Sequence, residues 1–404
     1  MIRRPPRSTP SNSSAASDVY KRQEISSVVE KIGEIIYKTW NYEIRKEGHE
    51  YYGYEYKVKE KPTKSFAYIH KIEGEMHETM AEAMDKVGLS KIVNPSNNVI
   101  IKVNLCGGFK KIVASQTPLK VTEALVDKLL DIVDNRRIFL AEANNWGHVV
   151  DDRLLKRRGY LQLCESRGIQ FLKLSYRPTV HFYFRGFKFP ILLSRELLLY
   201  REKTKLINAT VPKHHWECGV TLAAKNLYGA IADESKTKFH DYVSPMALDM
   251  VIAGSARVHN PDLNILGGKC ICAGLGPHFC RPRKFGYFII SNDFLAADKL
   301  GADVLGFPYE LVVHAQINEK LGIWNSDAPL LPGSATIPES IKRNIRKHAI
   351  PPKVVERNRT GLKFIYKTNP KLLRALRHFW FLIPPINWIF YGRRGDCETS
   401  WEEE

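Results

Sequence analysis

Six polar residues between positions 213 and 226 have types and spacing that suit chemistry. They follow the apolar run TKLINATVP and lie within KHHWECGVTLAAKN. Lysine ammonium groups bind anions, and imidazole exchanges protons near neutral pH. The segment therefore predicts a site for an anion or a metal ion. The six residues are Lys213, His214, His215, Thr221, Lys225 and Asn226.

The second half of this segment has the pattern of a helix start. Gly219 permits a tight turn, Thr221 can cap the helix that follows, and Lys225 lies one turn further along the same face. Unpaired backbone N–H groups at a helix start favour an anion, which Lys213 and Lys225 would neutralise. We expect a carboxylate or phosphate pocket. The simpler alternative is that Thr221 is only a cap and Lys225 is a solvated lysine.

Proton transfer is assigned to His215, because an imidazole beside an anion site titrates close to the operating pH. His214 should point elsewhere if the segment is extended, and a structural role remains open for both histidines. Glu142 ends another predicted strand and either accepts a hydrogen bond from the substrate or pairs with Lys102. Predicted catalytic residues are His215, Lys213 and Glu142. Predicted substrate-binding residues are Lys102, Asn104, Thr221, Lys225, Asn226 and Asp298.

Strands and helices alternate along the chain and place these residues. The strands are almost continuous apolar runs, as in a parallel sheet that is covered on both faces. We predict an α/β fold, with a mostly parallel, doubly wound sheet and helices on both faces. The carboxyl ends of its strands would form one polar rim. Strands are predicted at 65–72, 98–105, 137–143, 169–174, 203–209, 262–273 and 286–291, with helices at 76–87, 119–133 and 152–167 and after Thr221, Pro245 and Asp293.

Four regions surround or interrupt this pattern. Residues 1–23 have no hydrophobic periodicity and resemble translated adapter sequence from metagenomic assemblies, so we expect a non-native or disordered leader, with a basic targeting leader as the alternative. Residues 24–64 are predicted to be a helical aromatic prefix and linker before a core at 65–330. Residues 181–198 have the alternation of an inserted hairpin. Residues 331–404 form a basic extension for which we also expect helix.

A net charge of +18 indicates acidic partners, although a solvated basic face explains it equally well. The apolar, aromatic segment 378–391 is too short, and too interrupted by proline, to span a bilayer. With its basic flanks at 372–394 it suits docking on an anionic membrane surface or packing on protein. We expect a cytoplasmic protein, peripheral at the membrane in the first case. Nucleic acid is disfavoured, since no helix-turn-helix or aromatic platform is present.

Seven cysteines are scattered along the chain without a regular framework, so we expect reduced thiols rather than disulfides. There is no CxxCxxC run to hold an iron–sulfur cluster. Cys270, Cys272, His278 and Cys280 match no standard zinc module, and ordinary buried strand cysteines are expected. Neither a metal nor a cofactor can be named from these residues.

Several motifs together resemble the family called domain of unknown function 362. They are IIKVN at 101, FLAEA at 139, KHHWECGVTLAAKNLYGAI at 213, GLGP at 274 and SNDFLAADKLGADVLGF at 291. The resemblance implies an α/β protein of unassigned biochemistry. Because some members are fused to ferredoxin-type clusters, the resemblance also implies a ferredoxin-type redox partner as a candidate. The chain departs from the family pattern at Gln116–Pro118, where threonine, histidine and proline are common, and at Gly267–Gly268, where an aspartate–glycine pair is common.

Two functions fit these residues. The first is an enzyme that holds a small carboxylate or phosphate, with His215 as acid or base. The second is a non-catalytic protein that binds a metal ion, a cofactor or a redox partner at the same rim.

Overall fold

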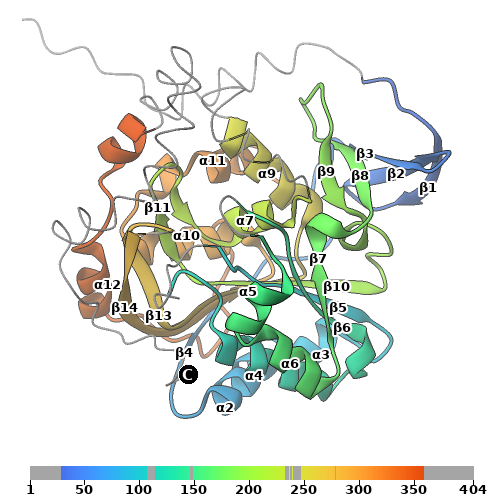
Figure 1. Ribbon diagram of the computed structural model, residues 1–404. Helices are drawn as coiled ribbons and strands as arrows, with labels where there is room; N and C mark the ends of the chain where they lie inside the picture. Colours follow the sequence, from blue (N-terminus) through green and yellow to red (C-terminus); the bar gives the residue numbers. More distant parts are fainter. Residues whose placement is uncertain are drawn as a thin grey trace, which may run out of the picture.

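A computed structural model describes residues 29–106, 114–145, 149–232, 236, 239, 247–277 and 279–358. The fold contains a nine-stranded sheet with helices on both of its faces and a five-stranded sheet at one side (Figure 1). The α/β class predicted from the sequence is therefore confirmed. The leader at 1–23 and the apolar segment 378–391 lie outside the described residues.

The large sheet has a mostly parallel centre. Its order is β12-β11-β13-β10-β5-β6-β7, and β14 joins β13 to β4 at another edge. Neighbouring strands from β13 to β7 are parallel, whereas β12, β14 and β4 pair antiparallel. Its strands are β4 (Ala67–Lys71), β5 (Asn98–Lys102), β6 (Ile138–Glu142), β7 (Gln170–Lys173), β10 (Thr204–Thr210), β11 (Lys213–His215), β12 (Gly219–Thr221), β13 (Leu263–Leu275) and β14 (Phe279–Ser291).

The direction in which strands are added changes between β5 and β10. From β5 the chain continues to β6 and β7 on one side, and it then returns to place β10 on the other side of β5. In α/β sheets, ligands commonly bind at such a reversal point, beside the carboxyl ends of the two strands, and we call this region the crevice.

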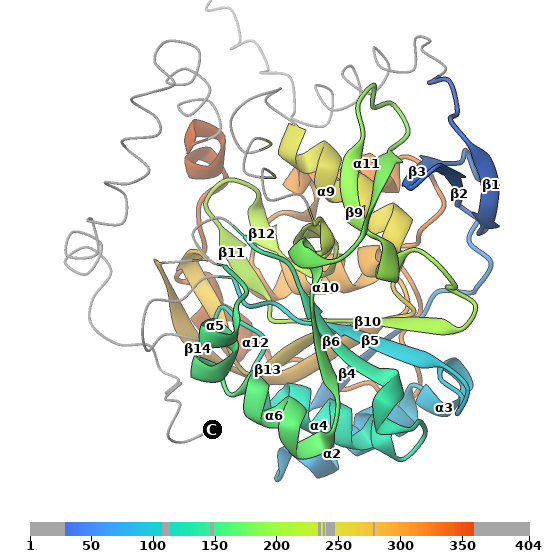
Figure 2. The ribbon, with the colours of Figure 1, turned by 45° about the vertical axis from the view of Figure 1, so that its right-hand side comes forward.

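Alternate residues of the central strands enter two separate cores. Val99 and Ile101 of β5 pack into one core, while Ile100 packs into the other. Helices α2, α4 and α6 cover the first face, and α7, α9 and α10 cover the second (Figure 2). Burial on both faces explains why the strands are continuous apolar runs rather than alternating ones.

The helices follow the predicted positions with one difference. The predicted helix 152–167 is two helices, because Gly159 adopts a positive φ of 73° between them. The α-helices are α2 (Met76–Lys86), α3 (Leu89–Ile92), α4 (Leu119–Leu130), α5 (Asp152–Arg157), α6 (Tyr160–Arg167), α7 (Ala223–Asn226), α9 (Ala247–His259), α10 (Phe294–Leu305), α11 (Val313–Glu319) and α12 (Glu339–Arg346). Short 3₁₀ turns are η1 (Asn135–Arg137), η2 (Leu174–Tyr176), η3 (Arg195–Leu197), η4 (Leu227–Ala230) and η6 (Tyr309–Leu311).

The prediction of a helical prefix is wrong. Residues 34–55 instead form β1 (Glu34–Lys38), β2 (Tyr42–Glu47) and β3 (Glu50–Glu55). Aromatic and β-branched side chains suit a pleated, half-buried surface, and Gly48 turns β2 into β3 with a positive φ of 57°. The predicted hairpin is present as antiparallel β8 (Thr179–Tyr183) and β9 (Ile191–Ser194), and β8 pairs with β3 to complete the small sheet.

The basic extension begins with helix α12, as expected, and residues 359–404 lie outside the described part. Within the described ranges, no helix combines the length and apolar character needed to cross a membrane.

Contact between β3 and β8 makes Gly53 a sensitive position. Gly53 and Phe182 are register partners, and a Cβ atom at Gly53 would lie 2.2 Å from Phe182 Cδ2. We expect Gly53→Ala to lower the free energy of unfolding in urea by about 1–3 kcal/mol. Adding Phe182→Leu should recover part of that loss, measured as a favourable coupling energy in a double-mutant cycle. Equal stability of Gly53→Ala and the parent protein would contradict the packing of the two segments.

Candidate functional site

Lys102 and Glu142 end the neighbouring strands β5 and β6 and form a buried ion pair. Lys102 Nζ lies 2.9 Å from Glu142 Oε1, and neither side chain is more than 1% exposed. Leu105 N donates to Glu142 Oε2 at 3.0 Å and Ala143 N donates to Oε1 at 2.9 Å. Both carboxylate oxygens are therefore occupied. Of the two roles open to Glu142, the ion pair is the one that its contacts match.

Lys213 of β11 projects into the same region. Its Nζ donates to Asn104 Oδ1 at 2.7 Å, to the Ser115 carbonyl, and to the Cys106 carbonyl at 3.4 Å. Burial, together with charge repulsion from Lys225, lowers the pKa of Lys213 to about 8. At neutral pH the group is still an ammonium ion, with a hydrogen-bond acceptor for each of its three protons.

A chain of four buried amides runs from Lys213 through the centre of the sheet. Asn104 Nδ2 donates to Asn226 Oδ1 at 2.8 Å, and Asn226 Nδ2 donates to Asn208 Oδ1 at 2.7 Å. Asn208 Nδ2 in turn donates to Asn264 Oδ1 at 2.8 Å, and Asn264 Nδ2 donates to a backbone carbonyl of β14 at 3.1 Å. We call this series the amide chain. It connects β5, α7, β10 and β13 at the crevice, with a single direction of donation.

Two further buried lysines approach this region. Lys225 Nζ lies 5.4 Å from the centroid of the Tyr228 ring, and Lys236 Nζ lies 5.9 Å from it. We define the lysine cluster as Lys102, Lys213, Lys225 and Lys236, all of them less than 9% exposed. Among the described residues, no carboxylate forms an ion pair with Lys213 or Lys225. The cluster therefore holds buried positive charge beyond what Glu142 balances.

The helix start differs from the prediction. The N-cap of α7 is Leu222, which makes no side-chain cap, so the prediction that Thr221 caps this helix is wrong. Asp298 of α10 instead accepts a hydrogen bond from Ala224 N at 3.2 Å. Thr221 ends β12, opposite Lys213. The carboxyl group of Asp298 already occupies this helix start. The prediction that the start is free to bind an anionic ligand therefore does not match its contacts.

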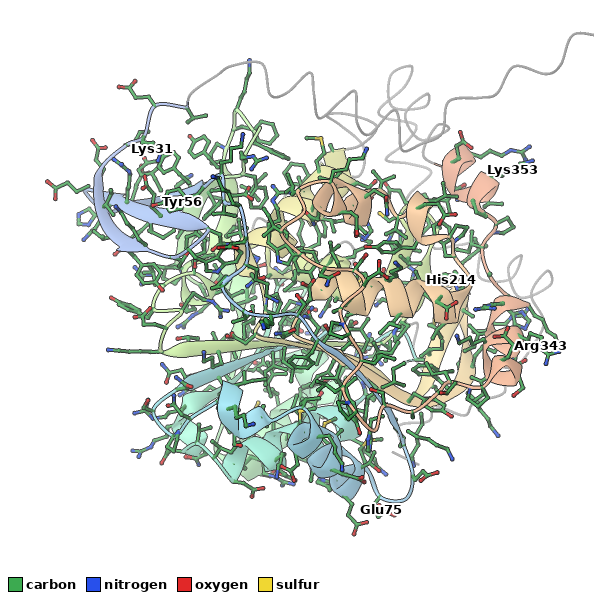
Figure 3. The ribbon with its side chains drawn as sticks, turned by 180° about the vertical axis from the view of Figure 1, so that it is seen from behind. Lys31, Tyr56, Glu75, His214, Arg343 and Lys353 are labelled. Atoms are coloured by element: carbon green, nitrogen blue, oxygen red, sulfur yellow. A yellow bond between two sulfur atoms is a disulfide. The ribbon has the colours of Figure 1, made fainter. Side chains whose placement is uncertain are left out.

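The two histidines of β11 point in different directions, as expected for an extended segment. His214 lies inside the molecule (Figure 3), where its Nε2 donates to Leu305 O at 3.1 Å and its Nδ1 accepts from Gly274 N at 3.2 Å. Burial lowers the pKa of His214 to about 4, so the ring is neutral. His214 is a structural histidine.

His215 has a different set of partners. Its Nδ1 accepts from Glu217 N at 3.1 Å and from Cys218 N at 3.2 Å, so Nδ1 carries no proton and the neutral ring is protonated at Nε2. A base needs a lone pair at the reacting nitrogen, and protonating Nδ1 would break both of these bonds. The arrangement suits a hydrogen-bond donor better than the acid or base role that we predicted.

The cysteines also differ from expectation. Cys272 and Cys280 form a disulfide across β13 and β14, with Cα atoms 5.4 Å apart, so the expectation of unpaired cysteines is wrong. Pairing of two antiparallel strands brings them together, which spacing along the chain does not reveal. Within the described ranges, no group of three or more histidine, cysteine, aspartate or glutamate side chains is arranged to hold a metal ion. His278 lies outside those ranges.

Sequence reasoning missed Asn208, Asn264, Thr117 and Cys106. Thr117 Oγ1 accepts from Asn104 N at 2.7 Å and donates to Ala209 O at 2.9 Å. These bonds hold the segment after β5, which carries Asn104 and which we call the crevice loop, to β10. The sequence did contain a signal for Asn208 and Asn264, because each is an amide within an apolar run, KLINATV or DLNILGG. A buried amide needs hydrogen-bond partners. The Cys106 thiol lies close enough to Lys213 for their charges to interact.

The two departures from the family pattern are neighbours in space. A Cβ atom at Gly268 would lie 3.2 Å from Pro118 Cγ, and Gln116 Nε2 donates to Leu105 O at 3.1 Å. Both departures therefore border the crevice loop that carries Asn104.

Comparison with known proteins defines the class. A model of the family described as domain of unknown function (DUF362) matches residues 99–303, which contain the crevice, the amide chain and most of the large sheet. The chain belongs to this family. A relative, the thylakoid-associated protein sll1697 of Synechocystis sp., is 24% identical over 246 residues, which are 58% of this chain and 71% of the relative.

Burial of Asp298 predicts a pH-dependent stability. Removal from water raises the pKa of Asp298 from 3.8 to about 8, and its Oδ2 has no hydrogen-bond partner among the described residues. Below pH 3.8 the group is protonated in the folded and unfolded states alike. As the pH rises towards about 8, only the unfolded chain ionises, so the folded state loses stability. We expect Asp298→Asn to raise the free energy of unfolding at pH 8 by about 2 kcal/mol or more.

Denaturant unfolding of Asp298→Asn across this pH range tests the prediction. Asp303→Asn, at an exposed position of the same helix, is the matched control and should keep the pH slope of the parent protein. If Asp298→Asn keeps that slope as well, Asp298 is ionised in the folded state and the prediction is wrong. The predicted part of Asp298 in substrate binding is separate from this experiment and stays a prediction.

Proposed function

We propose that this protein binds a small carboxylate- or phosphate-bearing molecule at the lysine cluster. The observation that carries the proposal is the burial of two ammonium groups, on Lys213 and Lys225, without an ion-paired carboxylate among the described residues. Burying an unpaired charge costs several kcal/mol, which an anionic ligand would offset. Position supports the same conclusion, because the cluster lies where the strand order reverses.

Lys213 and Lys225 have different roles in this proposal. Lys213 is held by three acceptors, so it supplies a fixed positive charge. Lys225 has no hydrogen bond within the described part of the chain and lies against the face of Tyr228, so it is the lysine with donors left for a ligand. The substrate-binding roles of Lys102 and Asn104 become indirect ones, since their polar atoms are engaged with Glu142, Asn226 and Lys213.

Substitution of Lys225 tests the proposal. At constant ionic strength, inorganic phosphate or acetate should raise the melting temperature of the parent protein. Lys225→Met should lose at least about tenfold in affinity for these anions, measured by calorimetry. Without ligand this variant should be as stable as the parent or more so, because an unpaired buried charge is gone. Lys86→Met, at an exposed position on α2, is the matched control. Equal responses from Lys225→Met and the parent would contradict anion binding at the cluster.

Two versions of this function differ in the part played by His215. In the enzymatic version His215 transfers a proton, and His215→Ala would keep anion binding but lose turnover. The non-catalytic version is favoured by one observation, the two backbone N–H groups that occupy His215 Nδ1. In that version His215→Ala weakens anion binding and has no turnover to lose. The ferredoxin-type redox partner belongs to this second version.

Peripheral membrane association is a second candidate function. It is supported by the name of the relative, a thylakoid-associated protein, and by the net charge of +18. Basic surfaces are attracted to anionic lipids. The full chain is expected to float with vesicles that contain an anionic phospholipid, and a chain that lacks residues 372–404 is expected to stay at the bottom of the gradient. A full chain that fails to float would exclude this function.

A further inference from the structure

A pocket lies at the end of the large sheet opposite the lysine cluster. Its walls come from the turn between β1 and β2, from the residues that precede β10 and β13, and from the last turn of α9. The cavity has a volume of about 460 Å³, within the range of small-molecule sites. Because β10 and β13 begin here and run towards the crevice, this pocket is separate from the site proposed above.

The pocket wall carries an excess of positive charge. Its cationic side chains are Lys38, Lys61, Lys91, Arg201 and Lys205, and its acidic ones are Glu202 and Asp262. Asp262 is already paired with Arg201 at 2.9 Å and with Lys205 at 3.5 Å, and Glu202 accepts from Tyr37. Lys61 is paired with Asp293, outside the wall, at 3.8 Å, so the excess comes from the other cations. Lys38 and Lys91 are exposed and form no ion pair among the described residues. A ligand of this pocket is therefore expected to be anionic.

A buried acceptor without a partner lies in the same wall. His259 is 1% exposed, and its Nδ1 donates to Ser255 O at 2.8 Å. The neutral ring then carries a lone pair on Nε2, which has no hydrogen-bond partner among the described residues. A buried polar atom of this kind costs free energy unless something donates to it. Because Nε2 has less than 1 Å² of accessible surface, a ligand hydroxyl or amino group would reach it and supply that hydrogen once the side chains around the ring shift.

Aromatic rings form part of the pocket wall. Tyr37, Trp40 and Phe66 line it, and the Trp40 ring packs 6.2 Å from the Trp324 ring, centroid to centroid. Trp324 is held in place because its Nε1 donates to Asn260 Oδ1 at 2.8 Å. Rings that are positioned in this way favour a flat, partly apolar ligand.

We propose that this pocket binds a small aromatic carboxylate that carries a hydroxyl or amino group. The carboxylate is attracted by the cations, the ring packs against the aromatic side chains, and the hydroxyl or amino group donates to His259 Nε2. The site is independent of the lysine cluster, and nothing in the proposed function requires it.

Three matched probes test the ligand class with the full chain. They are 4-hydroxybenzoate, benzoate, which lacks the donor, and phenol, which lacks the charge. Binding is followed by ligand-observed NMR and by tryptophan fluorescence, to which Trp40 should contribute. We expect 4-hydroxybenzoate to bind at least about tenfold more tightly than either of the other two. Equal binding of all three probes, or no binding of 4-hydroxybenzoate up to about 10 mM, would overturn the proposal.

Variants locate the binding. Lys38→Gln with Lys91→Gln should weaken both acids by about tenfold and leave phenol unchanged. His259→Phe should remove the preference for 4-hydroxybenzoate over benzoate. Lys353→Gln is the matched control, since Figure 3 shows Lys353 on the far side of the molecule from Lys31 and Tyr56, which flank the strands β1 and β3.

Lys225→Met separates this pocket from the lysine cluster. That variant should bind 4-hydroxybenzoate as the parent protein does. If it loses this binding while the Lys38 and Lys91 double variant keeps it, the acid occupies the lysine cluster, and the proposal of a second site is wrong.

Discussion

The amide chain is the constraint on which the rest of the site depends. Each asparagine donates to the next acceptor in the series, so the four side chains have one consistent orientation, which starts at Lys213 Nζ and ends at a carbonyl of β14. A buried amide that loses its partner is costly, and the whole series therefore favours a single arrangement of β5, β10, β13 and α7. That arrangement brings Lys102 and Lys225 close enough to Lys213 for their charges to interact.

The buried positive charge of the lysine cluster follows from the same arrangement of strands and helices. The sheet and its helices remove the lysine cluster from water, while the described residues supply Glu142 to balance Lys102. Burial lowers the pKa of Lys213 to about 8, so the group is still an ammonium ion near neutral pH, and three acceptors bind it. The protein thus keeps positive charge in a region of low polarity, where attraction of an anion is stronger than at the surface. At the start of α7, Asp298 is held in its neutral form by the same removal from water.

Agreement between sequence and structure was closest where periodicity carried the information. Apolar runs such as NVIIK and KLINA located the central strands, because a strand covered on both faces must be apolar at every position. The prefix was assigned wrongly because its aromatic residues suit either a helix face or a strand, and pairing of β3 with β8, far away in the chain, decided between them. The Cys272–Cys280 disulfide was missed for the same reason.

The sequence alone determined the α/β class and the polar ends of the strands, and it indicated the segment from Lys213 to Asn226 as the main part of the candidate site. Those features depend on local patterns, which survive without a three-dimensional structure. Only the tertiary structure decided which polar groups satisfy one another: Glu142 with Lys102, Asp298 with the start of α7, and His215 Nδ1 with its own backbone. Hydrogen-bond partners are set by distance and direction in space, and no spacing along the chain encodes them.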